Sequence, residues 1–377
     1  MMKRKWANCP VICPLIYLGL IGLAAPNAAL SQDPVERLMQ DNADGSLGGK
    51  YPTLFPEEEA AFFLDGEFLY MKADIDGLSY AWTFPEAFPA VPSDLSRRGP
   101  IPGGQNQDLK FRWDPGFRLA AGYRFSDTSW ELSALWTFYQ NHSKGTTSIP
   151  SLSNSTLIAT WFPSAFFSNE YLALNASAHW TLNFKTVDLC LGRTAFSTRT
   201  IAIEPFLAFR GAFIHQRFNT AYTNGGFFNV LGTNPTAVTM KTKNDFDGWG
   251  IRPGVNSTWY VAKNISFYAN GALSLLFGRY TINQRGSTAS SPFQSLMTVH
   301  DSYYQNAFEI DCGAGLKWEK FANCYHIAFS VGYEMMSWFD QNQLFNYFFL
   351  DRLPGAGQPA QGDLGIQGLN GSVHFDF

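Results

Sequence analysis

Apolar and polar residues alternate one by one along much of the chain from Phe62 onward. In the first such stretch Phe62, Leu64 and Phe68 share one parity, and Asp65 and Glu67 share the other. Side chains of a β-strand point alternately to its two faces, so this pattern predicts strands with one apolar and one polar face. About ten such stretches occur, at Phe62–Tyr70, Phe111–Phe125, Trp130–Phe138, Leu174–Arg193, Ile201–Phe213, Trp249–Trp259, Ile265–Leu275, Phe308–Trp318, Tyr325–Glu334 and Leu364–Phe377.

The predicted connections between these strands alternate in length. The short connections are Ser126–Ser129, Thr194–Thr198, Ala262–Asn264 and Glu319–Asn323. The long connections are Asp74–Asp108, Asn141–Glu170, Arg217–Lys243, Asn283–Tyr303 and Phe339–Gly362. This alternation is typical of a transmembrane antiparallel β-barrel with short periplasmic turns and long outer loops. Leu78, Tyr80 and Trp82 also alternate within a long connection. Such parts of the long connections either extend the strands above the membrane or supply extra strands, and about twelve strands is the second prediction.

The stretch Leu174–Arg193 contains a change of phase. Ala176 to Phe184 are apolar at even positions, whereas Val187, Leu189 and Leu191 are apolar at odd positions. One extra residue near Lys185 predicts a β-bulge there. A hairpin at the same place would put a long loop in the periplasm.

The composition favours a barrel over a soluble β-sandwich. Charged residues make up 15% of the chain and aromatic residues 16%, against about 25% charged in a typical soluble domain. The mean hydropathy is only −0.12, because the hydropathies of the apolar and polar faces of alternating strands cancel in the average. Beyond the first residues no apolar run reaches the ~18 residues that a membrane helix needs.

The N-terminal region predicts export. Lys3, Arg4 and Lys5 precede an apolar run and small residues, which is the order of a secretory signal peptide. We therefore expect a signal peptide at 1–31, a periplasmic arm at 32–60 and the barrel at 61–377. Removing the three basic residues takes the net charge from −4 to −7, which argues against nucleic acid as a partner.

The chemistry-bearing residues predict no catalytic, metal or cofactor site. The six histidines lack a spacing that would hold a metal or pair with a serine nucleophile. Cys190, Cys312 and Cys324 remain after export. Cys312 lies at a position that faces the lipid, and Cys324 lies at a position that faces the lumen. A disulfide between them would have to pass through the barrel wall, so we expect none.

The polar faces of the predicted strands contain both basic and acidic residues. The predicted lumen-lining residues are Arg112, Arg118, Arg124, Glu131, Glu204, Arg210, Arg252, Glu309, Asp311, Lys317 and Glu334. In a wet lumen they would sort polar solutes; alternatively they pair and fill the interior. Barrels of about eight strands are packed and those of 16 or more hold a channel.

We predict a narrow diffusion pore for small polar solutes or ions. The alternative is a non-conducting structural or adhesion barrel with surface loops, in which Trp161, Phe162, Phe166 and Phe167 would suit a contact with a host. These four residues would equally suit a loop core or an aromatic belt.

Several segments resemble a known family. Phe62–Ala81, Phe111–Tyr123, Val187–Arg193, Ile203–Gln216 and the last strand are similar to the MOMP-like outer-membrane proteins of Chlamydia-related bacteria and Legionella. Where that family usually has Arg before the Pro, this chain has Glu204. The resemblance implies an outer-membrane location and porin activity. The final strand, with Val373, Phe375 and Phe377, resembles the signature that the outer-membrane assembly machinery recognises, so outer-membrane lipid and that machinery are the expected partners.

Overall fold

The computed structural model forms one closed antiparallel barrel of ten strands. It describes residues 61–84, 104–125, 130–150, 155–161, 172–198, 200–224, 237–262, 264–288, 295–322, 325–347 and 357–376. The barrel strands are β1 (Ala61–Ile75), β4 (Trp113–Arg124), β5 (Trp130–Ser148), β8 (Asn175–Arg193), β10 (Ile201–Thr223), β11 (Ala237–Ala262), β12 (Ile265–Thr288), β13 (Ser295–Ala322), β14 (Tyr325–Trp338) and β17 (Leu364–Asp376). The prediction of about ten strands is therefore confirmed.

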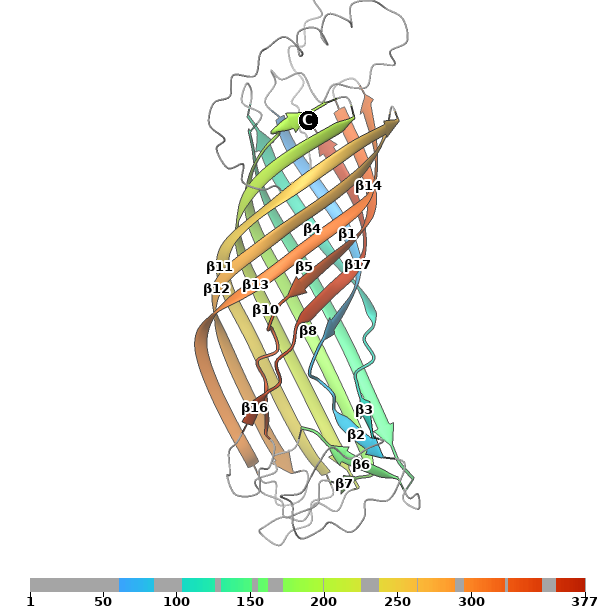
Figure 1. The fold of residues 1–377 in the computed structure, drawn as a ribbon, viewed down its shortest axis with the longest axis vertical. Coiled ribbons are helices and arrows are strands. Elements are labelled where there is room, and N and C mark those ends of the chain that lie inside the picture. The colour runs from blue at the N-terminus through green and yellow to red at the C-terminus, as the bar shows by residue number, and fades with distance from the viewer. Residues whose placement is uncertain are drawn as a thin grey trace, which may run out of the picture.

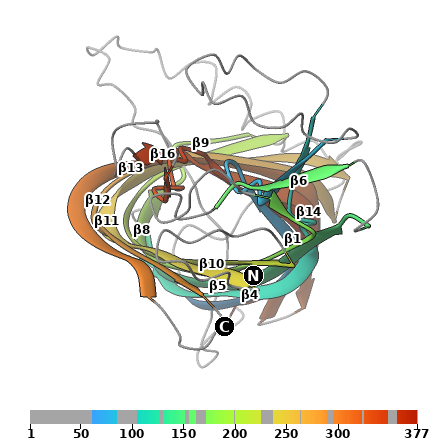
Figure 2. The ribbon, with the colours of Figure 1, turned by 90° about the horizontal axis from the view of Figure 1, so that it is seen from below.

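The barrel closes between its first and last strands. Each barrel strand pairs with the next one along the chain, and β17 pairs with β1 from Phe63↔Asp376 to Ile75↔Leu364. Figure 2, which looks along the barrel, shows the ring that results. Closure leaves no unpaired sheet edge, which a strand structure in lipid requires.

Small strands lie at the end of the barrel away from the C-terminus (Figure 1). β2 (Ala81–Phe84), β3 (Gln105–Gln107), β6 (Thr156–Ala159) and β7 (Leu172–Ala173) form a four-stranded sheet, and β15 (Phe345–Tyr347) pairs with β16 (Gly357–Pro359). β9 (Phe196–Ser197) pairs with the start of β10. Leu78, Tyr80 and Trp82 thus belong to or border a separate sheet, and they add no strand to the barrel.

The strands extend far into segments predicted as outer loops. Residues 217–223 and 237–243 are paired strand in β10 and β11, where the sequence predicted a loop from Arg217 to Lys243. The segments predicted as Asn283–Tyr303 and Asn141–Glu170 likewise contain parts of β12, β13 and β5. Four of the five connections at this end remain longer than those at the other end, but the connection 289–294 between β12 and β13 is shorter than the connection 194–200 between β8 and β10. The alternation of long and short connections is therefore confirmed except at 289–294, and the predicted bounds are corrected.

The predicted bulge near Lys185 is absent, because β8 pairs without a register shift along both neighbours. Even-numbered side chains of β8 are buried from one end to the other. Toward the C-terminal end of β8 the buried side chains include Thr186 and Asp188, while Val187 and Leu189 face outward. Toward its N-terminal end the buried side chains are apolar and the outward ones polar. The change of phase is therefore an inversion of polarity on an unbroken strand.

The same inversion occurs on the neighbouring strands. On β10 the outward residues change from Phe209 and Phe213 to His215 and Arg217; on β12 they change from Leu275 to Arg279. Outward-facing apolar side chains are stable in contact with lipid. Outward-facing polar side chains, on a wall whose inner face is apolar, are stable in contact with water. The inversion therefore marks the outer edge of the membrane. The lipid-facing part of β10, from Ile203 to Phe213, spans roughly 33 Å along the strand and, with the usual tilt, about 25 Å across the membrane.

Some predicted segments lie outside the described residues: the signal peptide at 1–31, the arm at 32–60, Cys324, Phe377, Phe162, Phe166 and Phe167. Their roles stay predictions. Among the described residues, no helix is long and apolar enough to cross a membrane.

Candidate functional site: the barrel interior

The membrane-level interior of the barrel contains a buried ion-pair network around Arg210. Its guanidinium donates to Asp188 on β8 at 2.6 and 2.7 Å and to Glu309 on β13 at 2.8 Å. Arg252 on β11 donates to Asp311 at 2.7 Å and to Asp188 at 3.4 Å. This first network ties together β8, β10, β11 and β13. Buried charges of this kind persist only when each is paired and hydrogen-bonded.

A second network surrounds Arg118 on the opposite side of the barrel. Its guanidinium donates to Glu67 on β1 at 2.8 Å and to Glu334 on β14 at 2.9 and 3.0 Å. It also donates to the Thr137 hydroxyl at 3.1 Å. Asn370 on β17 donates to the other oxygen of Glu67. A planar guanidinium that engages two carboxylates at once fixes five strands in one register.

Further charged groups lie nearer the short connections. Arg124 pairs with Glu131 at 3.0 Å, and Lys317 pairs with Glu319 at 3.3 Å. His374 lies 3.4 Å from Asp65. The named charged groups of this half of the interior are five Lys or Arg side chains and nine carboxylates. They are Arg118, Arg124, Arg210, Arg252 and Lys317, with Asp65, Glu67, Glu131, Asp188, Glu204, Glu309, Asp311, Glu319 and Glu334.

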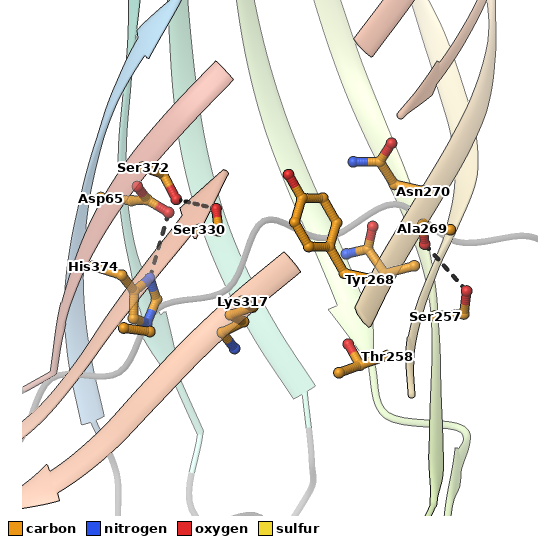
Figure 3. A pocket seen from close by; sticks show the side chains of 12 residues that line it. Asp65, Ser257, Thr258, Tyr268, Ala269, Asn270, Lys317, Ser330, Ser372 and His374 are labelled. Carbon is orange, nitrogen blue, oxygen red and sulfur yellow. Dashed lines mark hydrogen bonds and ion pairs between the residues drawn. The ribbon is translucent and has the colours of Figure 1, made fainter. Parts of the chain in front are cut away.

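Two small polar cavities lie among these groups. One, of about 30 Å³, separates the two networks and is lined by Arg118, Asp188, Arg210 and Glu334. The other, of about 40 Å³, is lined by Asp65, Lys317, Tyr268 and His374, with the Ser330–Ser372 hydrogen bond at its wall (Figure 3). Asn270 lines both. Each cavity has room for one or two water molecules, since a water needs at least about 10–15 Å³.

An apolar layer fills the interior on the outer side of the networks. Phe184 on β8 contacts Trp338 on β14 edge to face, with ring centroids 5.8 Å apart. Phe246 packs on Tyr280 at 4.7 Å. All four side chains are buried. The layer also contains buried Leu69, Met71, Tyr139, Trp180, Leu182, Ile214, Phe218, Leu276, Met336, Leu364 and Ile366.

Two segments fold into the outer end of the barrel and close over this layer. After β14 the chain turns inward, and the Gln341 carbonyl accepts hydrogen bonds from Asn244 at 2.6 Å and Gln216 at 3.4 Å. On the other side Tyr222 donates to the Tyr80 carbonyl at 2.7 Å and accepts from the Trp161 backbone. The described interior is thus occupied by protein from the networks to the outer end.

Ten of the eleven predicted lumen residues lie inside the barrel. Arg118, Arg124, Glu131, Glu204, Arg210, Arg252, Glu309, Asp311, Lys317 and Glu334 are buried or nearly so. Arg112 differs: its side chain is 67% exposed, it precedes β4, and it lies 3.8 Å from Asp114. It is not part of the interior, because the chain leaves the barrel wall before Trp113.

Several interior residues that the alternation placed on the polar face were not among the predicted lumen-lining residues. Asp188 and Glu67 each accept from a central arginine, and Asp65, Glu319, His326 and His374 lie in the same half. Their parity gave the signal: Asp188 lies directly opposite Arg210 in the register, and Glu67 lies opposite Arg118. Trp161 is buried and its indole nitrogen donates to the Ser79 carbonyl, so among the alternatives for this residue the structure supports a loop core and not a surface contact.

The cysteines and the terminal strand can be placed as well. Cys190 is buried and Cys312 is exposed on the lipid side, and both are free thiols. Val373 and Phe375 face outward on β17. Within the described residues no group of His, Cys, Asp and Glu is arranged to hold a metal ion.

A closed antiparallel barrel with a lipid-facing apolar band and an ion-paired interior defines a β-barrel membrane protein. The family described as Legionella pneumophila major outer membrane protein precursor matches residues 54–377. The chain belongs to that family, and its location is the outer membrane.

Solved structures give only distant likenesses. The outer membrane protease OmpT from Escherichia coli is 10% identical, with a TM-score of 0.31 over 88% of this chain and 99% of that one. A FadL homologue from Pseudomonas aeruginosa is 6% identical, with a TM-score of 0.24 over 87% of this chain and 95% of that one. The toluene transporter TodX from P. putida is 7% identical, with a TM-score of 0.17 over 85% and 90%. No curated protein matches the chain.

Proposed function

We propose that this protein is a closed outer-membrane barrel that anchors and displays a water-facing outer wall, and that it conducts no solutes in this conformation. The observation that carries the proposal is the contact of Phe184 with Trp338 across the barrel. An apolar layer has no groups that replace the water around an ion, so a charged solute that entered it would lose its hydration without compensation.

The outer wall supports a role at the cell surface. β10 continues for ten residues beyond Phe213, from Ile214 to Thr223, which is roughly 33 Å along the strand. β11 and β12 extend beside it. Their inner faces pack on the apolar layer, which holds the wall rigid, and their outer faces carry the polar residues that neighbours outside the membrane would meet.

Planar bilayer recording tests the proposal. Purified protein should give no ion current across the bilayer. As a control, heat-modifiable mobility of protein recovered from vesicles shows that the protein has inserted as a folded barrel. Stepwise currents from the wild-type protein would overturn it.

A narrow pore is the second candidate function, and the two polar cavities favour it. Both are lined by Asn270 and lie in the membrane-level half, where the named carboxylates outnumber the Lys and Arg side chains nine to five. Conduction would require the apolar layer to move aside. A pore of this kind would prefer cations, so reversal potentials in a KCl gradient distinguish it from an anion-selective or unselective leak.

A further inference from the structure

The outward faces of five neighbouring strands carry a band of basic residues just outside the membrane. The pairing of the strands arranges this band in two rows of residues that lie directly opposite one another. The row farther from the membrane is Lys144, His179, Asn219, Lys241 and Arg285, and the nearer row is His142, Thr181, Arg217, Lys243 and Asn283. These two rows, called here the basic band, hold five Lys or Arg side chains, two His and no carboxylate.

Like charges lie directly opposite each other in this band. Arg217 on β10 is the cross-strand partner of Lys243 on β11, and Lys241 is the partner of Arg285 on β12. All four side chains are exposed, and none of them forms an ion pair with another described residue. Opposed like charges destabilise a sheet unless an anion lies between them.

The carboxylates nearest the band already have partners. Asp114 accepts a hydrogen bond from the His142 backbone nitrogen at 3.0 Å and lies 3.8 Å from Arg112. Two others lie in the two rows closer to the lipid. Asp247 lies 3.1 Å from the His215 ring and opposite Arg279. Asp245 lies opposite His215 and two residues along β11 from Lys243. These two rows hold two carboxylates beside His215 and Arg279, so the excess of positive charge lies in the band above them.

A shallow groove of about 330 Å³ crosses the band. Lys144 and His179 form one side, Lys241 and Thr239 form the other, and the small side chains of Ser177 and Ala221 make the floor. The groove exists because small outward residues on β8 and β10 lie between long basic ones on β5 and β11. Its charge and shape suit the acidic groups of a sugar.

The distance of the basic band from the hydrocarbon layer matches the position of lipid headgroups. Arg217 is four residues beyond Phe213, the last lipid-facing residue of β10, which is roughly 13 Å along the strand and about 10 Å above the hydrocarbon. This is the outer part of the headgroup layer. The lipid of the outer leaflet of an outer membrane is a glycolipid that carries phosphates and acidic sugars at this level.

We propose that the basic band binds the phosphate and carboxylate groups of the outer-leaflet lipopolysaccharide, with one acidic sugar in the groove beside Ala221. The four opposed cations then share the anions of one lipid molecule. The site lies outside the barrel, so it is independent of the state of the interior.

Native mass spectrometry of the detergent-solubilised barrel tests this proposal with Kdo2-lipid A, a defined lipopolysaccharide with two phosphates and two acidic sugars. The wild-type barrel should bind one molecule. The quadruple substitution R217Q, K241Q, K243Q and R285Q should weaken binding at least tenfold. The double substitution R217Q and K243Q should weaken binding several-fold. A matched double variant, R193Q and K320Q, removes two exposed positive charges near the short connections at the other end of the barrel. It should bind within about twofold of the wild type.

A second variant separates shape from charge. Ala221→Trp fills the groove without changing any charge, and it should also weaken binding, by several-fold. Heat-modifiable mobility shows which variants are folded. Equal weakening by the two double variants, or unchanged binding by the quadruple one, would overturn the proposal. Millimolar inorganic phosphate should not displace the lipid, and displacement would instead identify a free-phosphate site.

Discussion

Phe184 and Trp338 meet across the barrel, with ring centroids 5.8 Å apart and ring planes at 75°. β8 and β14, which carry them, are five strands apart in either direction around the ring of ten. A ten-stranded barrel is therefore narrow enough for two aromatic side chains from opposite walls to close it. The pair divides the interior into an ion-paired half within the membrane and an apolar half outside it.

Removing the Trp338 ring should destabilise the barrel and loosen this closure. Trp338→Ala leaves a cavity in a fully buried site, so we expect a loss of about 3–5 kcal/mol in the free energy of unfolding. Urea unfolding of protein refolded into vesicles measures this loss. Trp338→Phe keeps most of the ring contact and should lose clearly less. Equal stability of Trp338→Ala and the wild type would show that the layer is not packed as described.

Arg210 should be among the most sensitive positions of the interior. Arg210→Gln leaves Asp188 and Glu309 buried without their main partner, which is expected to cost about 3–5 kcal/mol. The exposed Arg112→Gln serves as the control and should change stability by no more than about 0.5 kcal/mol. Both free energies come from the same vesicle unfolding experiment.

A second substitution tests whether the loss arises from the unpaired charge. Asp188→Asn added to Arg210→Gln removes one of the two stranded carboxylates. The double variant should therefore lose less stability than the sum of the two single variants. Simple additivity would mean that Arg210 and Asp188 act separately.

Much of the architecture could be predicted from the sequence because alternation reports directly on the two faces of a strand. Asp65 and Glu67 against Leu64 and Phe68 already assigned the inner and outer faces of β1, and the structure has the same assignment. The alternation of short and long connections gave the direction of the strands. The charge pairs could not be predicted without the register of the strands, because the register decides that Asp188 rather than another carboxylate lies opposite Arg210.

Strands that extend above the membrane were one of two alternatives for the long connections, and the bounds of this outer half could not be predicted for a physical reason. The predicted bounds assumed one environment on the outside of each strand, whereas the outer face of β8 passes from lipid to water near Lys185. Apolar side chains then belong inside, and the pattern shifts by one residue without any change in the backbone. The same reversal made the strand ends near Arg217 and Lys243 look like polar loops.

The inversion on β8 can be tested by labelling single cysteines on intact cells with a membrane-impermeant maleimide, in a background without the native cysteines. Asn183→Cys should react because this position faces water outside the membrane, whereas Leu182→Cys should not because it points into the apolar layer. Leu189→Cys faces lipid and should also be protected. A bulge at Lys185 would exchange the first two results, so labelling of Leu182→Cys with protection of Asn183→Cys would contradict the inversion.

Arginine substitutions on the same face of β8 give the corresponding energies. Leu189→Arg places a charge against hydrocarbon and should destabilise the barrel by about 2–4 kcal/mol if the position lies near the midplane. Asn183→Arg places the same side chain in water on the same face of the strand, six residues away, and should change stability by no more than about 0.5 kcal/mol. Vesicle unfolding compares the two variants directly. Similar losses at both positions would place Asn183 inside the membrane and move the lipid boundary outward along β8.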